Sequence, residues 1–184
     1  IGNLEDITLR AIRLLKEVDL VLCEDTRVTK RIFEKYAIST PMLSYHAQSG
    51  ETKVEIILDE ISKGKNIALV TDAGTPVISD PGSLLISTIR KQYPELKIEA
   101  VPGPSALTAA LSIAGVPTHE FIFLGFMPHK KGRETLFKEI ADSERTMVFY
   151  ESTHRIMKTL ESLKTINKKV TVVREITKIY EEVI

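Results

Sequence analysis

The sequence predicts an α/β fold built around a parallel sheet. Two short apolar runs, 19–23 and 66–70, have the length and composition of buried strands. Each follows a stretch with helical periodicity, and this alternation of helices and strands favours a parallel sheet. The pattern changes near Pro117, so we expect two domains, 1–117 and 118–184.

The elements of the first domain follow in order along the chain. Helical periodicity predicts three helices, at 6–18, 54–64 and 83–92, and Gly64 stands where it can end the second of them. A shorter and weaker candidate strand follows at 98–101. After it comes a helix of small residues, which we expect Ser105 to cap.

The second domain repeats the alternation. It is predicted to contain strands at 121–126, 146–150 and 169–173, separated by helices at 134–142 and 154–163. A basic loop lies between the first strand and the first helix.

Composition limits the classes of function. The 25 basic and 25 acidic residues cancel, so any attraction to nucleic acid must come from local patches. The single cysteine, Cys23, allows no internal disulfide, and we expect a cytoplasmic protein. The longest weakly polar run, 106–116, is shorter than the ~20 residues that span a membrane. The four histidines show no ligand spacing, so no metal is expected.

Residues 70–82 (VTDAGTPVISDPG) carry more special residues than a plain turn needs. They follow a predicted strand, where α/β sheets bind ligands. Gly74 can take a positive φ and allow close approach, and Asp72 offers a carboxylate. Ser79 or Asp80 is expected to cap the next helix. A tight strand-to-helix connection without a ligand is the alternative for this segment.

Two further loops follow strands. The segment 22–31 (LCEDTRVTKR) places Glu24 and Asp25 directly after a strand, with Thr26 as the expected helix cap. The segment 100–111 (AVPGPSALTAAL) again combines prolines, a glycine and small residues. Capping and solvated charge explain each loop alone, but three such loops after parallel strands are predicted to converge on one crevice.

Six blocks of the sequence carry a resemblance to a known family. They are IGNLEDITLRAIRLLKEVDLVLCEDTR, LVTDAGTPVISDPG, VPGPSALTAAL, FLGFMPHKKGR, FYESTHR and REITKIYEE. In this order they resemble the bacterial small-subunit rRNA 2′-O-ribose cytidine methyltransferases of the tetrapyrrole methylase superfamily. Members usually begin with a strand before Ile1 and continue beyond Ile184, so we expect the printed sequence to be a piece of a longer chain.

The resemblance implies S-adenosyl-L-methionine (SAM) as methyl donor, ribosomal RNA or the small ribosomal subunit as partner, and a homodimer. It implies two α/β domains, with a mainly parallel N-terminal sheet, a mixed C-terminal sheet and the donor in the cleft between the domains. The residues that it implies for donor binding are Asp72, Ala73, Gly74, Thr75, Pro76, Ile78, Ser105, Ala106, Gly125, Phe126 and Met127.

Methyl transfer to a ribose hydroxyl benefits from a base, and carboxylates at strand ends qualify. The candidates are Glu24, Asp25 and Glu151, and helix capping is the alternative for Glu151. Local cations are the candidates for RNA phosphate contacts, with a solvated charge run as the alternative. These are Arg27, Lys30, Arg31, Lys130, Lys131 and Arg133.

Two other functions fit the same patterns. One is methylation of a tetrapyrrole or another small molecule, because fold does not fix function. The other is SAM binding without catalysis.

Overall fold

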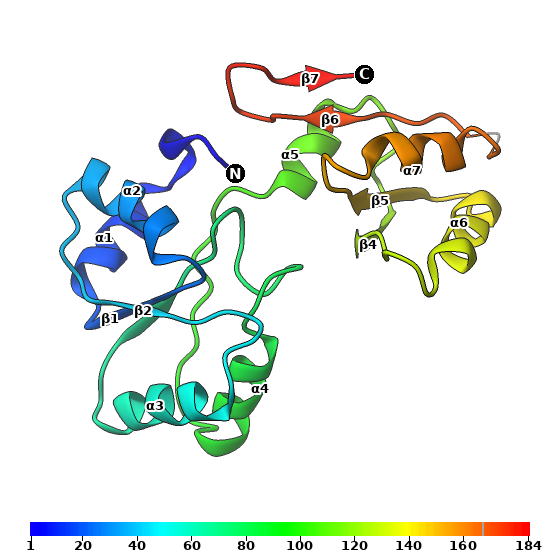
Figure 1. The fold of residues 1–184 in the computed structure, drawn as a ribbon. Coiled ribbons are helices and arrows are strands. Elements are labelled where there is room, and N and C mark those ends of the chain that lie inside the picture. The colour runs from blue at the N-terminus through cyan, green and yellow to red at the C-terminus, as the bar shows by residue number, and fades with distance from the viewer. Residues whose placement is uncertain (167) are drawn as a thin grey trace. The chain divides into compact units, whose positions relative to one another are not determined.

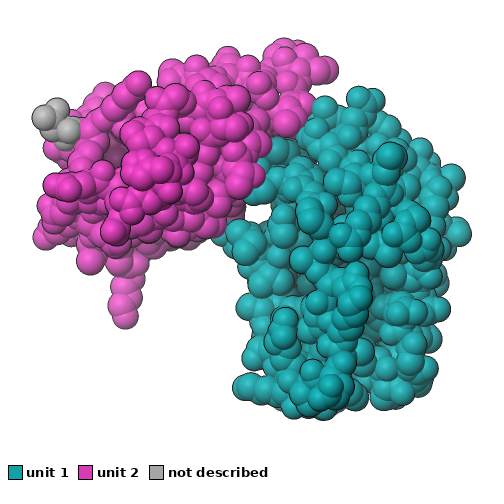
Figure 2. All heavy atoms as spheres, turned by 180° about the vertical axis from the view of Figure 1, so that it is seen from behind, with its two compact units in different colours: residues 1–106 teal, residues 107–184 magenta. Residues whose placement is uncertain are grey.

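The structure, a computed structural model, describes residues 1–166 and 168–184. These residues form two compact units, 1–106 and 107–184, shown in teal and magenta in Figure 2. The domain boundary predicted near Pro117 falls within the second unit. Among the described residues, no helix is both long and apolar enough to cross a membrane.

Unit 1 is built on a three-stranded parallel sheet with the order β2-β1-β3 (Figure 1). The strands are β1 (Leu20–Cys23), β2 (Met42–Ser44) and β3 (Ile67–Leu69). The structure thus confirms the two predicted strands at 19–23 and 66–70 and adds β2.

The prediction of a strand at 98–101 is wrong, because this segment joins no ladder among the described residues. Glu99 and Ala100 are exposed, so the segment lacks the buried apolar face that stabilises a strand. Glu99 instead forms an exposed ion pair with Arg10.

Helices cover both faces of this sheet. They are η1 (Leu4–Asp6), α1 (Leu9–Glu17), α2 (Thr26–Tyr36), α3 (Glu51–Ser62) and α4 (Ser83–Gln92), and α5 (Ala106–Ile113) begins where unit 1 ends. Successive side chains of a strand point to opposite faces. Leu22 of β1 accordingly packs in one core cluster with α3 and α4, whereas Val21 packs in another with α1 and α2.

Two predicted helix caps are corrected. Asp25, not Thr26, is the N-cap of α2, because its carboxylate accepts a hydrogen bond from the Arg27 N–H. Neither Ser79 nor Asp80 caps α4, which begins at Ser83 after an N-cap glycine with no side-chain bond. The prediction for the end of α3 is confirmed, because Gly64 has a positive φ just beyond the last turn of that helix.

Unit 2 contains a parallel pair of strands, β4 (Phe121–Phe126) and β5 (Thr146–Tyr150), and an antiparallel pair, β6 (Val173–Arg174) and β7 (Glu182–Val183). Helices α6 (Arg133–Asp142) and α7 (Ile156–Leu163) follow β4 and β5. Of the predicted strand at 169–173, only Val173 belongs to a strand, β6, which continues to Arg174. The α/β fold class is confirmed. Among the described residues of unit 2, the parallel and antiparallel pairs form two separate sheets, whereas one mixed sheet was predicted.

Candidate functional site

The loops after β1, β2 and β3 meet at one edge of the sheet of unit 1, because parallel strands share the direction of their carboxyl ends. The ladder extends past the strands: the Tyr45 N–H donates to the Cys23 carbonyl at 2.8 Å, and the Val70 N–H donates to the Leu22 carbonyl at 2.8 Å. The predicted convergence of the first two loops, 24–31 and 70–82, is therefore confirmed within unit 1.

Hydrogen bonds tie these two loops together. The Thr71 hydroxyl donates to the Glu24 carboxylate at 3.3 Å, and the Asp25 N–H donates to the Asp72 carboxylate at 3.2 Å. The Ser44 hydroxyl, at the end of β2, donates to the Glu24 carbonyl at 3.3 Å. Glu24 therefore lies where all three strand ends meet.

The backbone of the loop after β3 is strained. Gly74, Val77, Ser79 and Gly82 all have positive φ, from 62° to 130°. Val77 is β-branched, and such a residue rarely adopts this conformation. A Cβ on Gly82 would approach Leu69 Cδ2 to 2.9 Å, and the φ of 130° at this position also favours glycine. Strain of this kind collects at functional sites.

The residues predicted to bind the donor fall in two groups. Within unit 1, Asp72, Ala73, Thr75 and Ile78 are exposed, whereas Gly74, Pro76, Ser105 and Ala106 are half-buried. A Cβ built on Gly74 would lie 3.9 Å from the Pro104 carbonyl oxygen, so the loop lies beside the segment that leads into α5. Ala73 is exposed and Gly74 has no side chain, so a ligand can approach the backbone of the loop, which fits a donor site.

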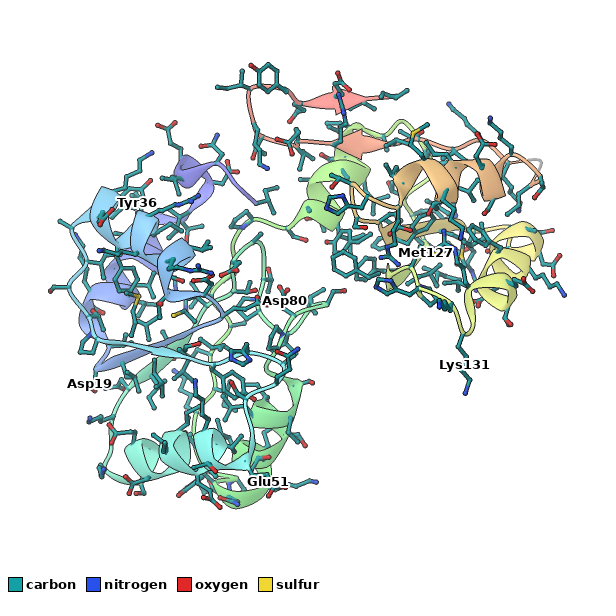
Figure 3. The ribbon with its side chains drawn as sticks, in the orientation of Figure 1. Asp19, Tyr36, Glu51, Asp80, Met127 and Lys131 are labelled. Carbon is teal, nitrogen blue, oxygen red and sulfur yellow. The ribbon has the colours of Figure 1, made fainter. Side chains whose placement is uncertain are left out.

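The other group, Gly125, Phe126 and Met127, belongs to unit 2. Gly125 has a φ of 66° within an irregular stretch of the β4–β5 ladder, and Phe126 is 55% exposed. Met127 is buried in the core of unit 2 (Figure 3). Its N–H donates to the Tyr150 carbonyl, and its carbonyl accepts from Arg155 at 2.9 Å.

The two acids after β1 differ in their surroundings. Hydrogen bonds from the Arg27 side chain and N–H lower the pKa of Asp25 to about 2. Burial, with the neighbouring carboxylates of Asp72 and Asp80, raises the pKa of Glu24 above its ordinary value. Glu24 therefore has the stronger affinity for a proton of the two.

Glu151 lies directly after β5, as the sequence predicts, but its side chain is only 2% exposed. It pairs with Arg155 at 2.7 Å and Arg133 at 3.4 Å, and it accepts hydrogen bonds from the Thr159 hydroxyl and the Ser152 N–H. Burial acts to raise its pKa, but these four partners outweigh burial and lower it.

The predicted RNA-binding cations do not share one environment. On α2, Arg27 is paired with Asp25, and Lys30 lies 3.6 Å from Glu34. Lys130 and Lys131 are exposed, and Figure 3 shows Lys131 projecting outward from unit 2. The remaining two cations are Arg31, which is exposed, and Arg133, which is only 11% exposed in its side chain.

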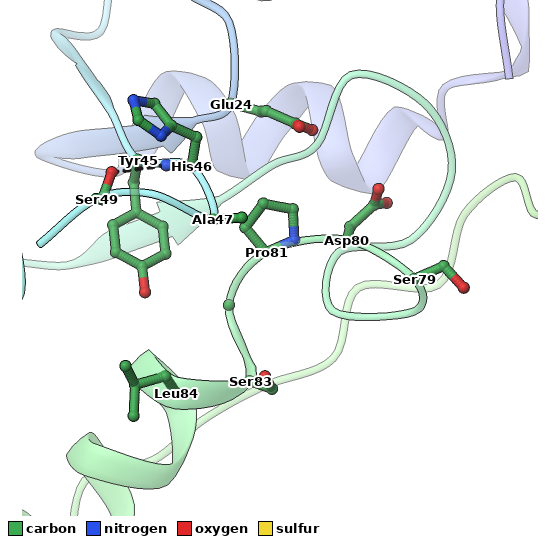
Figure 4. A pocket seen from close by; sticks show the side chains of 11 residues that line it. Glu24, Tyr45, His46, Ala47, Ser49, Ser79, Asp80, Pro81, Ser83 and Leu84 are labelled. Atoms are coloured by element: carbon green, nitrogen blue, oxygen red, sulfur yellow. Dashed lines mark hydrogen bonds between the residues drawn. The ribbon is translucent and has the colours of Figure 1, made fainter. Parts of the chain in front are cut away.

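A cavity of about 450 Å³ opens at the same edge of unit 1 (Figure 4). It is lined by Glu24 after β1, by residues of 45–49 after β2 and by 79–84, which lead into the first turn of α4. Among these, His46 was not predicted from the sequence, because a single histidine after a three-residue strand carries no recognisable pattern. Asp80 was predicted only as a cap. No cluster of metal-ligating side chains occurs within residues 1–166 and 168–184.

Comparison with known proteins relates the whole chain to a family. Residues 1–184 match the family model of the tetrapyrrole (corrin/porphyrin) methylases. The chain is 44% identical to "Ribosomal RNA small subunit methyltransferase I" of Thermotoga maritima, over 99% of this chain and 82% of that protein. It is 44% identical to the protein of the same name from Halalkalibacterium halodurans, over 99% of this chain but 63% of that protein.

Solved structures share the fold at lower identity. A cobalt precorrin-4 methyltransferase matches with a TM-score of 0.69 and 21% identity, over 99% of this chain and 80% of that one. The uroporphyrin-III C-methyl transferase of Thermus thermophilus, solved with S-adenosyl homocysteine, matches with a TM-score of 0.63 and 21% identity, over 98% and 81% of the two chains. The chain therefore belongs to the tetrapyrrole methylase family.

Proposed function

We propose that the chain is the larger part of a SAM-dependent methyltransferase that methylates the 2′-hydroxyl of a cytidine ribose in small-subunit ribosomal RNA. The observation that carries the proposal is the 44% identity, over nearly the whole chain, to relatives named small-subunit rRNA methyltransferases. The protein acts in the cytoplasm as a homodimer. A monomer in sedimentation of the complete protein at micromolar concentration would contradict the dimer.

The donor is proposed to bind at the loop 72–78, at Ser105 and Ala106, and at Gly125 and Phe126. The exposed small residues and positive φ of the loop in unit 1 support this assignment. Met127 supports the site from the core, because both its backbone polar groups are already bonded within unit 2.

When bound, SAM would supply an electrophilic methyl group for transfer from its sulfonium sulfur to the ribose 2′-oxygen. Glu24 accepts the proton of that hydroxyl, and its raised pKa suits this role. Asp25 fits less well, because Arg27 stabilises its charged form. Glu151 is proposed to stabilise unit 2, since its carboxylate is buried and bound to two arginines.

RNA phosphates are proposed to contact the exposed cations Lys130, Lys131, Lys30 and Arg31. Arg27 contributes only in part, because it is already paired with Asp25. Arg133 holds the loop from inside unit 2, where it donates to the Pro128 carbonyl and the Thr159 hydroxyl.

Methylation of a tetrapyrrole is the second candidate, favoured by the family description and by the solved structures. The lower identity to those structures, 21% against 44%, ranks it behind ribosomal RNA.

A methyl-transfer assay separates the two candidates. The complete protein is given SAM labelled in its methyl group, with small ribosomal subunits in one reaction and a carboxylated tetrapyrrole in another. Label in the RNA, at the ribose of one cytidine, is the expected result. Label only in the tetrapyrrole would overturn the proposal.

A matched pair of variants tests the donor site. Gly74→Val places a side chain in the loop, whereas Gly64→Val introduces the same positive-φ strain at the end of α3, where the space is open. Calorimetry should show that only Gly74→Val loses SAM binding. Equal affinity in both folded variants would remove the loop from the donor site.

A further inference from the structure

The cavity at the strand ends of unit 1 has a lining that restricts its ligand. None of the proposed donor residues at 72–78 lines this cavity. The cavity is therefore distinct from the donor loop, although its lining includes Ser79, which directly follows that loop. Its volume of about 450 Å³ lies within the usual range for small-molecule sites.

The charge of the lining excludes anionic ligands. Among the described residues, no Arg or Lys lines the cavity, whereas Glu24 and Asp80 bring two carboxylates from separate loops (Figure 4). Phosphates and carboxylated macrocycles would be repelled here. A neutral ligand that is rich in hydrogen-bond donors fits.

His46 supplies a further polar group to the lining of the cavity. Its Nδ1 atom is buried and has no hydrogen-bond partner among the described residues. The backbone N–H of His46 donates to the Ser49 hydroxyl at 2.9 Å. Buried polar atoms are nearly always bonded, so the unpaired Nδ1 atom indicates that the His46 side chain lacks a partner that the described residues could supply.

We propose that this cavity receives the base and ribose of the acceptor cytidine, turned out of the RNA, and that it selects cytosine over uracil. The inference rests on the proposed function. The Asp80 carboxylate accepts a hydrogen bond from the exocyclic amine of cytosine, where uracil presents an acceptor instead. His46, which lines the cavity, contacts the same nucleoside, and the ribose hydroxyl faces Glu24. The nucleotide's phosphates stay outside the cavity.

The first test measures base preference. RNA substrates with cytidine or uridine at the methylated position are compared for the wild type, Asp80→Asn and His46→Phe, with His119→Phe as a matched control at an exposed histidine outside the cavity. The wild type should prefer cytidine about tenfold or more. Asp80→Asn should lose most of this preference, because its amide can also donate to uracil.

His46→Phe should raise KM for RNA about threefold to tenfold and leave SAM affinity unchanged. His119→Phe should match the wild type in every measurement. An unaltered cytidine preference in Asp80→Asn, together with an unaltered KM in His46→Phe, would overturn the proposal.

The second test needs no turnover. Cytidine, uridine and inorganic phosphate are titrated separately into the complete protein, and the imidazole C–H signals are followed by NMR. Cytidine should shift the His46 signal more than uridine does, phosphate should not shift it, and the His119 signal should stay fixed. A His46 signal that ignores cytidine would contradict the cavity assignment. A shift with cytidine in a protein that methylates no RNA would leave the cavity standing while the proposed function fails.

Discussion

Glu24 and Glu151 stand at equivalent places in the two units, each directly after a parallel strand, yet their environments are opposite. Glu24 is half-buried near Asp72 and Asp80, and its pKa is raised. Glu151 is held by two arginines, and its pKa is lowered. The comparison shows that the strand end decides where a carboxylate lies, whereas its partners decide whether it can take a proton.

Removal of the Glu151 carboxylate is expected to have the largest effect. Glu151→Ala leaves Arg133 and Arg155 largely buried without their counter-charge, which typically costs about 3–5 kcal/mol of unfolding free energy. Urea denaturation of the complete protein measures this loss. A stable but inactive Glu151→Ala would instead make Glu151 the base.

The matched control is an exposed pair in the same unit. Glu120 lies 3.0 Å from Arg145, and both side chains are more than half exposed. Glu120→Ala should therefore change the unfolding free energy by only about 0–1 kcal/mol.

The loop beside Glu24 is held by backbone geometry rather than by ion pairs. Gly82→Ala adds a Cβ that would clash with Leu69 and Val77, at a φ of 130°, and we expect it to cost roughly 1–3 kcal/mol. Gly50→Ala is the control, because its φ is negative and its Cβ would meet open space. Equal stability of the two variants in thermal unfolding would refute the strain in this loop.

The smallest effect concerns the surface cations. Replacing Lys130 and Lys131 by alanine should weaken RNA binding. The slope of log affinity against log salt concentration should become less steep by roughly 0.7–0.9 for each lost phosphate contact. SAM affinity should not change. Arg133→Ala should act differently, by lowering the stability of unit 2, because its side chain lies inside that unit. A salt slope that stays at the wild-type value in the double variant would assign both lysines to solvated surface.

Much of the fold could be predicted from the sequence, because apolar runs and helical periodicity are local signals. The helix at 83–92 was predicted to the residue, whereas β2 was missed because its apolar run is only Met42 and Leu43, between a proline and a serine. Residues 98–101 are apolar enough for a strand, but pairing depends on partners elsewhere in the chain. The site shows the same limit: Glu24, Asp25 and Glu151 look alike in the sequence, and only the ion pairs that the structure forms with Arg27, Arg133 and Arg155 distinguish them.

The pH dependence of methyl transfer tests the central claim, that Glu24 accepts the proton, most directly. Single-turnover rates are measured for the wild type, Glu24→Gln and Glu151→Gln with saturating SAM and RNA. The wild-type rate should rise with pH as Glu24 loses its proton, with an apparent pKa above the ordinary value of 4.5. Glu24→Gln should be about 10²–10⁴-fold slower and lack this rise, whereas Glu151→Gln should keep it. Loss of the rise in Glu151→Gln, with its retention in Glu24→Gln, would contradict the account.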